Sequence, residues 1–138
     1  MDSTWPKKTA DAFWLAAARN LEQRRTSPNE LQMLLIPGVV CLALSIERGF
    51  KAILVKAGKP PKTHDLKRLF DALPQSVQQE IIIKCNCPQA SFDQALSIVA
   101  KSFEEWRYVY ELENPQIDLP FLSLLADAVR LVTDAHAL

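Results

Sequence analysis

The 138-residue sequence has little glycine, histidine and cysteine, and no excess of charge of either sign. It holds three glycines, two histidines and three cysteines, and its 16 basic side chains balance 16 acidic ones. Scarce glycine and the lack of alternating apolar and polar stretches argue against a β-rich fold. The apolar run over 33–46 contains Pro37-Gly38 and falls short of the ~18 residues of a membrane-spanning helix. With no secretory signal at its start, the sequence predicts a cytoplasmic protein without membrane association.

The cysteines and histidines are too few for a typical zinc site. Cys41, Cys85 and Cys87 are an odd number, and Cys41 lies in an apolar run, where a free thiol acts as a small hydrophobic group. A structural zinc needs about four ligands, and only His64 and His136 are there to complete a set. We therefore expect no metal, no cofactor and no disulfide framework, and Cys85 and Cys87 receive no role.

Helical periodicity between prolines is what the sequence does contain. With 49% apolar residues, it predicts a single domain over 1–138. The expected fold is all-α: a compact up-and-down bundle of four principal helices with one or two short extra helices. The principal helices are predicted over about 9–25, 39–57, 91–113 and from 119 onward, and shorter ones over 30–36, 66–73 and 76–84. Three tryptophans are expected in the core or in a dimer seam: Trp5, Trp14 and Trp106.

Several residues mark the predicted helix ends. Ser27-Pro28-Asn29-Glu30 and Ser91-Phe92-Asp93-Gln94 each match a capping box, in which a serine hydroxyl and a later carboxylate or amide satisfy free backbone amides. Pro37 either kinks a long helix or opens a new one, and we favour a new start. Further ends are predicted at Gly58, at Thr63 or Asp65, and at Asp118, with 59–62 as a stiff loop.

Charge is unevenly distributed along the chain. Residues 47–68 hold seven basic and two acidic side chains, whereas residues 104–138 hold two basic and seven acidic ones. A basic segment is one feature of nucleic-acid-binding surfaces. It also fits a solvated helix end that pairs with the acidic part, within the fold or across a dimer, and the neutral overall balance favours this second interpretation.

Glu47 and Lys51 are charged residues in the most apolar predicted helix. Their spacing of four favours an ion pair along the helix. Because unpaired buried charges are costly, we expect them to pair with each other, with Arg107 or with His64, or else to open onto a cleft. The simpler role for this pair is to fix helix register at the rim of the core.

His64 and Arg107 are the candidates for chemistry. His64 precedes Asp65 at a predicted helix start, where it either serves as a general acid or base or makes a local hydrogen bond. The helix predicted over 91–113 carries an apolar stripe from Phe92 through Phe103 to Tyr110. Arg107 lies beside this stripe, with Tyr110 and Glu111 one turn on. Its planar guanidinium suits either a phosphate or the Glu47 carboxylate. Together these residues form the predicted binding site: Glu47, Lys51, His64, Asp65, Arg107, Tyr110 and Glu111.

Three segments together resemble a known family. Pro37 precedes Leu42-Ala43-Leu44-Ser45-Ile46-Glu47-Arg48-Gly49-Phe50-Lys51-Ala52-Ile53-Leu54. A Gly-Pro loop and His64-Asp65-Leu66-Lys67-Arg68-Leu69 follow, and then Trp106-Arg107-Tyr108 before an acidic residue. In order and spacing this resembles HEPN domains (higher eukaryotes and prokaryotes nucleotide-binding), over roughly residues 10–110.

The resemblance implies a helical bundle that forms a homodimer, often in prokaryotic toxin–antitoxin or defence systems. Some such domains are metal-independent ribonucleases with an arginine followed, four to six positions later, by a histidine. Here no histidine follows Arg107 within 108–114. Arg130 and His136 have the arginine-to-histidine spacing of that motif, but a separation of six residues places their side chains about 120° apart on a helix.

Three functions remain as hypotheses. The one we favour is a noncatalytic HEPN-like dimeric module that engages a nucleotide, a nucleic acid such as RNA, or a partner protein. The alternative is a metal-independent ribonuclease that uses Arg107 with His64 or, less well, His136. The third is an antitoxin-like assembly role in which apolar faces mate with another chain of a two-component system.

Overall fold

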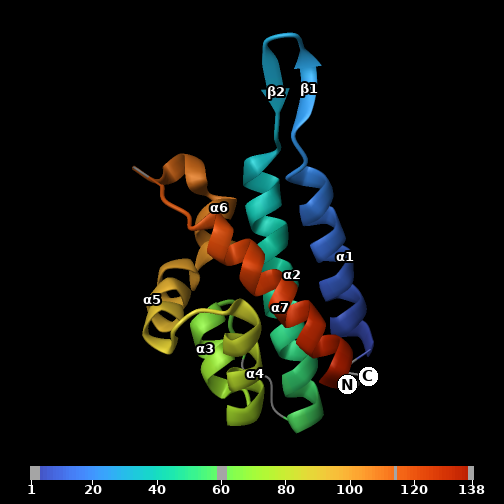
Figure 1. Ribbon diagram of the computed structural model, residues 1–138, viewed down its shortest axis with the longest axis vertical. Coiled ribbons are helices and arrows are strands. Elements are labelled where there is room, and N and C mark those ends of the chain that lie inside the picture. Colours follow the sequence, from blue (N-terminus) through green and yellow to red (C-terminus); the bar gives the residue numbers. More distant parts are fainter. Residues whose placement is uncertain (1–3, 59–61, 114, 137–138) are drawn as a thin grey trace.

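Long helices form the body of the molecule in a computed structural model that describes residues 4–58, 62–113 and 115–136 (Figure 1). α1 (Thr4–Asn20) and α7 (Leu119–His136) both pack on the central α2 (Leu35–Ala57). α3 (Leu66–Ala72), α4 (Gln75–Cys85), α5 (Gln89–Val99) and α6 (Ser102–Arg107) are shorter, and the 3-10 turn η1 (Val109–Glu111) follows α6. The predicted helical bundle is thus confirmed, except that two strands interrupt it and one predicted long helix is divided.

α2 is central because its sequence is apolar on most sides. Twelve of its residues are buried, including Val39, Ile46 and Phe50. Pro37 lies in the first turn, where its missing N–H leaves no bond unmade, so the helix starts at Leu35, slightly before the predicted start. Gly58 ends it in the left-handed conformation with φ of 102°, as predicted. The predicted loop over 59–62 lies, except for its last residue, outside the described residues.

The predicted short helix over 30–36 is wrong. Strands β1 (Arg24–Ser27) and β2 (Glu30–Gln32) form an antiparallel hairpin that projects beyond the ends of α1 and α2 (Figure 1). Ser27 Oγ accepts a bond from the backbone amide of Asn29, at 3.3 Å, in the turn. Serine, proline and asparagine favour tight turns for the same reasons that they favour helix starts. α1 therefore ends at Asn20 and not near Arg25.

The second predicted capping box is also wrong. α5 begins at Gln89 after Pro88, and Ser91 lies inside the helix without capping it. The helix predicted over 91–113 breaks after Val99, and α6 begins at Ser102. α5 packs on α3 whereas α6 packs on α2, so a single straight helix would not reach both neighbours. Tyr110, predicted on the apolar stripe, is 78% exposed.

Two predicted caps are confirmed. The Asp65 side chain accepts bonds from the backbone amides of Lys67 and Arg68, at 3.0 and 3.1 Å, and begins α3. Asp118 Oδ1 accepts the amide of Phe121 at 3.0 Å at the start of α7. These bonds satisfy amides that have no partner within the helix.

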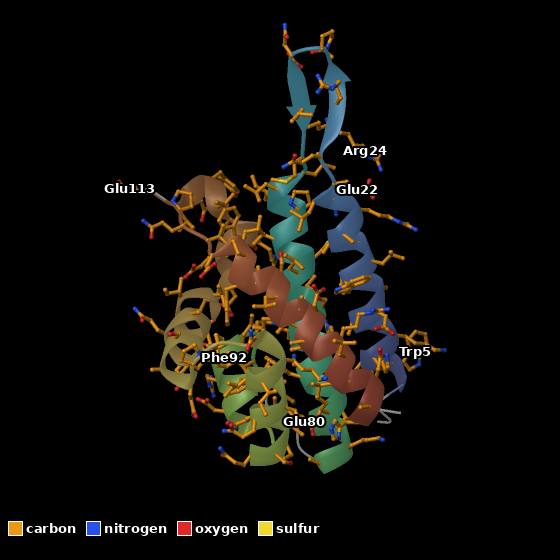
Figure 2. All side chains as sticks on the ribbon, viewed as in Figure 1. Trp5, Glu22, Arg24, Glu80, Phe92 and Glu113 are labelled. Atoms are coloured by element: carbon orange, nitrogen blue, oxygen red, sulfur yellow. The ribbon has the colours of Figure 1, made fainter. Side chains whose placement is uncertain are left out.

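The three tryptophans have different environments. Trp106 is buried in the core, as predicted. Trp14 is half-buried against the core, and its indole N–H donates to Asp127 at 2.8 Å. Trp5 points away from the bundle and is 73% exposed, so its placement in the core is wrong for the single chain (Figure 2).

Gly49 allows α2 and α7 to approach closely. A Cβ atom at this position would lie 2.5 Å from Cγ1 of Val129, a branched side chain with little freedom to move. We expect Gly49→Ala to lower the free energy of unfolding by about 1–3 kcal/mol in urea denaturation. At Gly38 the atom nearest to an added Cβ is Cδ2 of Leu21, whose half-buried side chain has more room to move. Gly38→Ala is the control and should cost less; a Gly49→Ala protein as stable as wild type would contradict the prediction.

Candidate functional site

A buried carboxylate on α2 is the centre of the candidate site. Glu47 has no solvent-exposed surface, although it is charged at neutral pH in water. It lies on the same helix as Ile46 and Phe50, which are also fully buried. Because an isolated charge in such surroundings is strongly disfavoured, the groups around Glu47 must stabilise it.

Three basic side chains surround this carboxylate. The Nδ1 atom of His64 contacts Oε1 of Glu47, and Arg48 Nε and Lys51 Nζ lie 3.6 and 3.9 Å from Oε2. Neither Oε2 nor Arg48 Nε has a hydrogen-bond partner within the described residues. The predicted pairing of Glu47 with Lys51 and His64 is therefore confirmed, and the Glu47–His64 contact is the closest of these.

His64 is fixed at one side and open at the other. Its side chain is 45% exposed, and the contact with Glu47 engages Nδ1. The neighbouring backbone is also held, since Thr63 Oγ1 accepts the amide of Asp65 at 3.1 Å and Leu66 donates to the carbonyl of Ala100 at 2.8 Å. A carboxylate on Nδ1 fixes the imidazole orientation and favours the tautomer in which Nε2 accepts a proton.

Phe103 brings His64 and Arg107 to the same aromatic ring. The His64 and Phe103 ring centroids are 4.7 Å apart, and Cζ of Arg107 lies 5.0 Å from the Phe103 centroid. The Arg107 guanidinium also donates to the Tyr108 hydroxyl at 3.1 Å. Arg107 is thus exposed on an aromatic surface and does not pair with Glu47, the other partner considered for it.

The remaining predicted site residues have other positions. The Asp65 carboxylate caps α3, so its acceptor oxygen Oδ1 is occupied by backbone amides. Tyr110 and Glu111 lie in η1 and are exposed, and in the described part of the chain they form no hydrogen bond or ion pair with His64 or Glu47. Sequence reasoning missed Arg48 and Phe103 as members of the cluster. Phe103 was predicted on the apolar stripe, but only the structure shows that its ring lies beside both His64 and Arg107.

A groove beside α3 adds basic residues to this region. It is lined by Asp65, Lys67, Arg68, Ser97, Ile98, Ala100, Lys101 and Glu105. Lys67 pairs with Asp71 at 3.0 Å, whereas Arg68 and Lys101 have no carboxylate partner in the described part of the chain. Cations without a carboxylate partner among the described residues therefore lie four residues after His64, at Arg68, and directly before the start of α6, at Lys101.

Arg130 and His136 do not form a common site. Arg130 lies over the ring of Trp14, with its Cζ 4.2 Å from the centroid, and its Nε is 3.9 Å from Asp11 on α1. His136 instead lies 3.0 Å from Glu80 on α4. The two side chains thus contact different helices.

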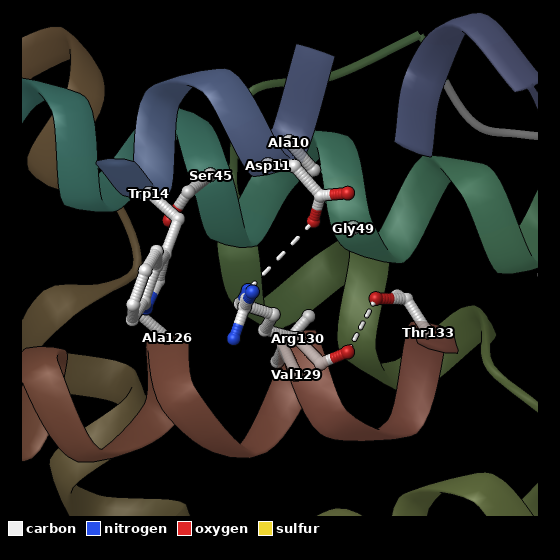
Figure 3. Close-up of a pocket in the computed structure, with 9 residues that line it drawn as sticks. All are labelled: Ala10, Asp11, Trp14, Ser45, Gly49, Ala126, Val129, Arg130 and Thr133. Carbon is white, nitrogen blue, oxygen red and sulfur yellow. Dashed lines mark hydrogen bonds and ion pairs between the residues drawn. The ribbon is translucent and has the colours of Figure 1, made fainter. Parts of the chain in front are cut away.

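A second polar cluster lies where α1 meets α7. Asp11, Trp14, Ser45 and Arg130 line a small cleft there, with room for about one water molecule (Figure 3). Nearby, the buried Lys7 pairs with Asp11 and Asp134, at 2.9 and 2.5 Å.

The ion pairs of Lys7 stabilise the packing of α1 on α7. Burial alone would lower the pKa of Lys7, but the two carboxylates outweigh it and raise that pKa above its ordinary value. Their stabilising effect is present at neutral pH and is lost as the pH rises through this raised pKa. The cleft and its cluster therefore serve to hold the two helices together.

The described residues contain no group of three or more His, Cys, Asp or Glu side chains placed to hold a metal ion. Within them, no helix is both long and apolar enough to cross a membrane. No family model matches this chain, and the searches of curated proteins and of solved structures also found no match.

The cysteines differ in expected reactivity. Burial raises the pKa of the Cys85 thiol to about 12, and Cys41 also has a raised pKa because it is buried. Cys87 is half-buried beside the turn that follows α4. Because the thiolate is the reactive form, we expect a disulfide reagent at pH 8 to modify Cys87 of the folded protein well before Cys85.

Mass spectrometry of digested protein would identify the modified cysteine. Protein unfolded in urea is the control, in which Cys85 should become as reactive as Cys87. Faster labelling of Cys85 in the folded protein would contradict the prediction.

Proposed function

We propose that this chain is a HEPN-like module that forms a homodimer and binds a phosphate-bearing ligand, a nucleotide or RNA, around His64. The observation that carries the proposal is the half-exposed imidazole held by the buried Glu47, with Arg107 on the same aromatic ring. A fixed imidazole and an arginine fork are both suited to phosphate oxygens. The order of the sequence motifs supports the family, and with it a place in a prokaryotic defence or toxin–antitoxin type system.

The neighbouring groove supports an extended anionic ligand. Arg68 and Lys101 contribute two cations that have no carboxylate partner among the described residues, and Asp65 and Glu105 line the same groove. A ligand with several phosphates would contact both the groove and the His64 side chain, and each phosphate contact adds to the salt dependence of binding. RNA and nucleoside triphosphates meet this requirement, whereas a neutral small molecule does not.

Fluorescence anisotropy with a labelled single-stranded RNA and with a labelled nucleoside triphosphate tests the proposal. We expect His64→Gln and Arg107→Ala each to weaken binding at least about tenfold, the scale of one lost charge-assisted hydrogen bond. His136→Gln is the matched control, because His136 pairs with Glu80 on α4. Equal affinity of wild type, His64→Gln and Arg107→Ala would overturn the site, and no binding of either probe would favour a partner protein.

A metal-independent ribonuclease is the second candidate, and one observation favours it. Glu47 engages Nδ1 of His64, which leaves Nε2 to move a proton, while Arg107 is placed to stabilise charge on a phosphate. In such a reaction the RNA 2′-oxygen attacks phosphorus, and the bond to the 5′-oxygen breaks. His64 would take the proton of the 2′-hydroxyl or give one to the leaving oxygen.

Incubation of the purified protein with mixed RNA in chelator separates the two candidates. Cleavage by wild type that is lost in both Arg107→Ala and His64→Ala would establish the ribonuclease. Cleavage that survives both substitutions would indicate a contaminant. Binding without cleavage at high protein concentration would leave the noncatalytic module.

A further inference from the structure

The β1–β2 hairpin is exposed on both faces. Every residue of β1 and β2 is exposed except Ser27, which is intermediate. Two-stranded hairpins without a packed face are only marginally stable in water. Large apolar side chains nevertheless extend from β2 into the start of α2. All of them are at least 36% exposed: Leu31, Met33, Leu34 and Ile36. Contiguous exposed apolar residues of this kind mark an interaction surface.

The hairpin also presents unpaired positive charge. Arg25 lies opposite Leu31 in the ladder, so these two side chains share one face of the hairpin. Arg25 donates to the carbonyl of Pro28 at 2.7 Å, but within the described residues it has no carboxylate partner. Arg19, at the end of α1 below the hairpin, also has none there. The hairpin end thus combines aliphatic side chains with two arginines that lack a carboxylate partner in this part of the structure, and the exposed Glu30 and the Arg24–Glu22 ion pair lie beside them.

The α6–η1 surface has the complementary character. It carries two exposed tyrosines and a leucine that are 46%, 78% and 41% exposed: Tyr108, Tyr110 and Leu112. Four glutamates accompany them, and none forms an ion pair within the described residues: Glu104, Glu105, Glu111 and Glu113. Arginine guanidinium groups stack favourably on tyrosine rings and pair with carboxylates.

The two surfaces lie at the same end of the molecule. Figure 1 shows the hairpin extending beyond the N-terminal end of α2 and the orange segment that follows α6 beside that end, and Figure 2 places Glu113 and Arg24 at this end. Two copies related by a two-fold axis near this end would each present a hairpin to the other's α6–η1 surface. Both contacts would then form in the same dimer, so neither surface would be left free to bind a third copy.

We propose that the β1–β2 hairpin of one copy docks on the α6–η1 surface of a second copy, in a closed two-fold dimer. This inference rests on the proposed homodimer and adds the surface through which it forms. Arg25 meets the η1 carboxylates, and Leu31 packs against Tyr110. This contact buries the apolar side chains on the hairpin face that carries Arg25 and Leu31. The second copy thereby supplies the packing that stabilises the hairpin, which has no packed face within one chain.

Light scattering coupled to gel filtration tests the interface. Wild type is expected at twice the 15.5 kDa chain mass. Leu31→Asp should yield a monomer at concentrations where wild type is dimeric. Ile83→Asp is the matched control, because Ile83 is 72% exposed but lies on α4, away from the hairpin. Circular dichroism confirms that each variant keeps its helices.

Charge reversal identifies the partner surface. Arg25→Glu and Glu111→Arg should each raise the dimer dissociation constant at least about tenfold by placing like charges together. The double variant should recover at least part of the wild-type affinity. Additive weakening in the double variant, or a dimer unaffected by Leu31→Asp, would overturn the interface while leaving the proposed homodimer in place.

Two other outcomes separate this inference from the proposed function. If the wild-type protein stays monomeric over a 100-fold range of protein concentration, both the interface and the homodimer are overturned, whichever ligand the protein binds. If Leu31→Asp and Arg25→Glu change RNA affinity but not the mass, the hairpin contacts nucleic acid and the docking between copies is wrong. Loss of ligand binding in His64→Gln with an intact dimer would support the ligand site and leave the interface standing.

Discussion

Glu47→Ala is expected to lower the free energy of unfolding by about 3–5 kcal/mol, the usual cost of removing one partner of a buried ion pair. The substitution leaves His64, Arg48 and Lys51 without the carboxylate that they surround. It also opens a cavity in α2, since the Glu47 side chain is fully buried. Urea denaturation followed by circular dichroism measures the effect.

Two further substitutions make this result specific. Glu47→Met fills the same space without charge and should cost less than Glu47→Ala, because it opens no cavity, while both variants leave the surrounding cations without the carboxylate. Asp93→Ala, at an exposed position on α5, should have no measurable effect. If Glu47→Ala were no more destabilising than Asp93→Ala, the carboxylate would not be the buried centre of the cluster.

Phe92→Ala should be comparably severe, with a loss of about 3–5 kcal/mol in the free energy of unfolding. Phe92 is fully buried on α5, and its ring centroid lies 5.1 Å from that of Phe70 and 5.6 Å from that of Phe121. Phe70 in turn lies 6.1 Å from Phe50. These four rings connect α2, α3, α5 and α7, so their loss weakens several helix contacts at once.

Ile98→Ala on the same helix is the control for Phe92→Ala. Ile98 is 57% exposed, and alanine has the higher helix propensity, so this substitution should change stability little. Thermal unfolding of both variants gives the comparison. Similar melting temperatures for the two would show that the aromatic cluster is not central to stability.

Helices with strong periodicity and clear caps were predictable from the sequence. The apolar residues of α2 are buried on most sides, and Gly58 ends the helix because glycine adopts a positive φ without strain. Asp65 and Asp118 begin α3 and α7 by accepting backbone amides. These features depend on local residue chemistry, which the sequence contains in full.

The hairpin and the divided helix were not predictable for different reasons. Ser27-Pro28-Asn29-Glu30 satisfies a capping box and a tight turn equally, and only the pairing of Arg25 with Leu31 decides between them. The stripe over 92–110 has one helical period, but its two halves pack on different neighbours. Local strand pairing therefore decided the first case, and tertiary packing decided the second.

The site was partly predictable. Charges on the apolar face of a helix need partners, which correctly directed attention to Glu47, Lys51 and His64. Whether Arg107 reaches Glu47 depended on where α6 lies, and the periodicity gave no information on that position. Phe103 acquired its place beside His64 only through the break before α6.

That break has a consequence for local unfolding. The carbonyl of Ala100, at the break, accepts the first amide of α3 from Leu66, at 2.8 Å. Opening of the α5–α6 segment would therefore release the start of α3 and the residues before it. Native-state hydrogen exchange should give the Leu66 amide the same opening free energy as the amides of α5, so that the two segments behave as one cooperative unit. The order of the His64 imidazole then depends not only on Glu47 but also on a segment that lies 36 positions further along the chain.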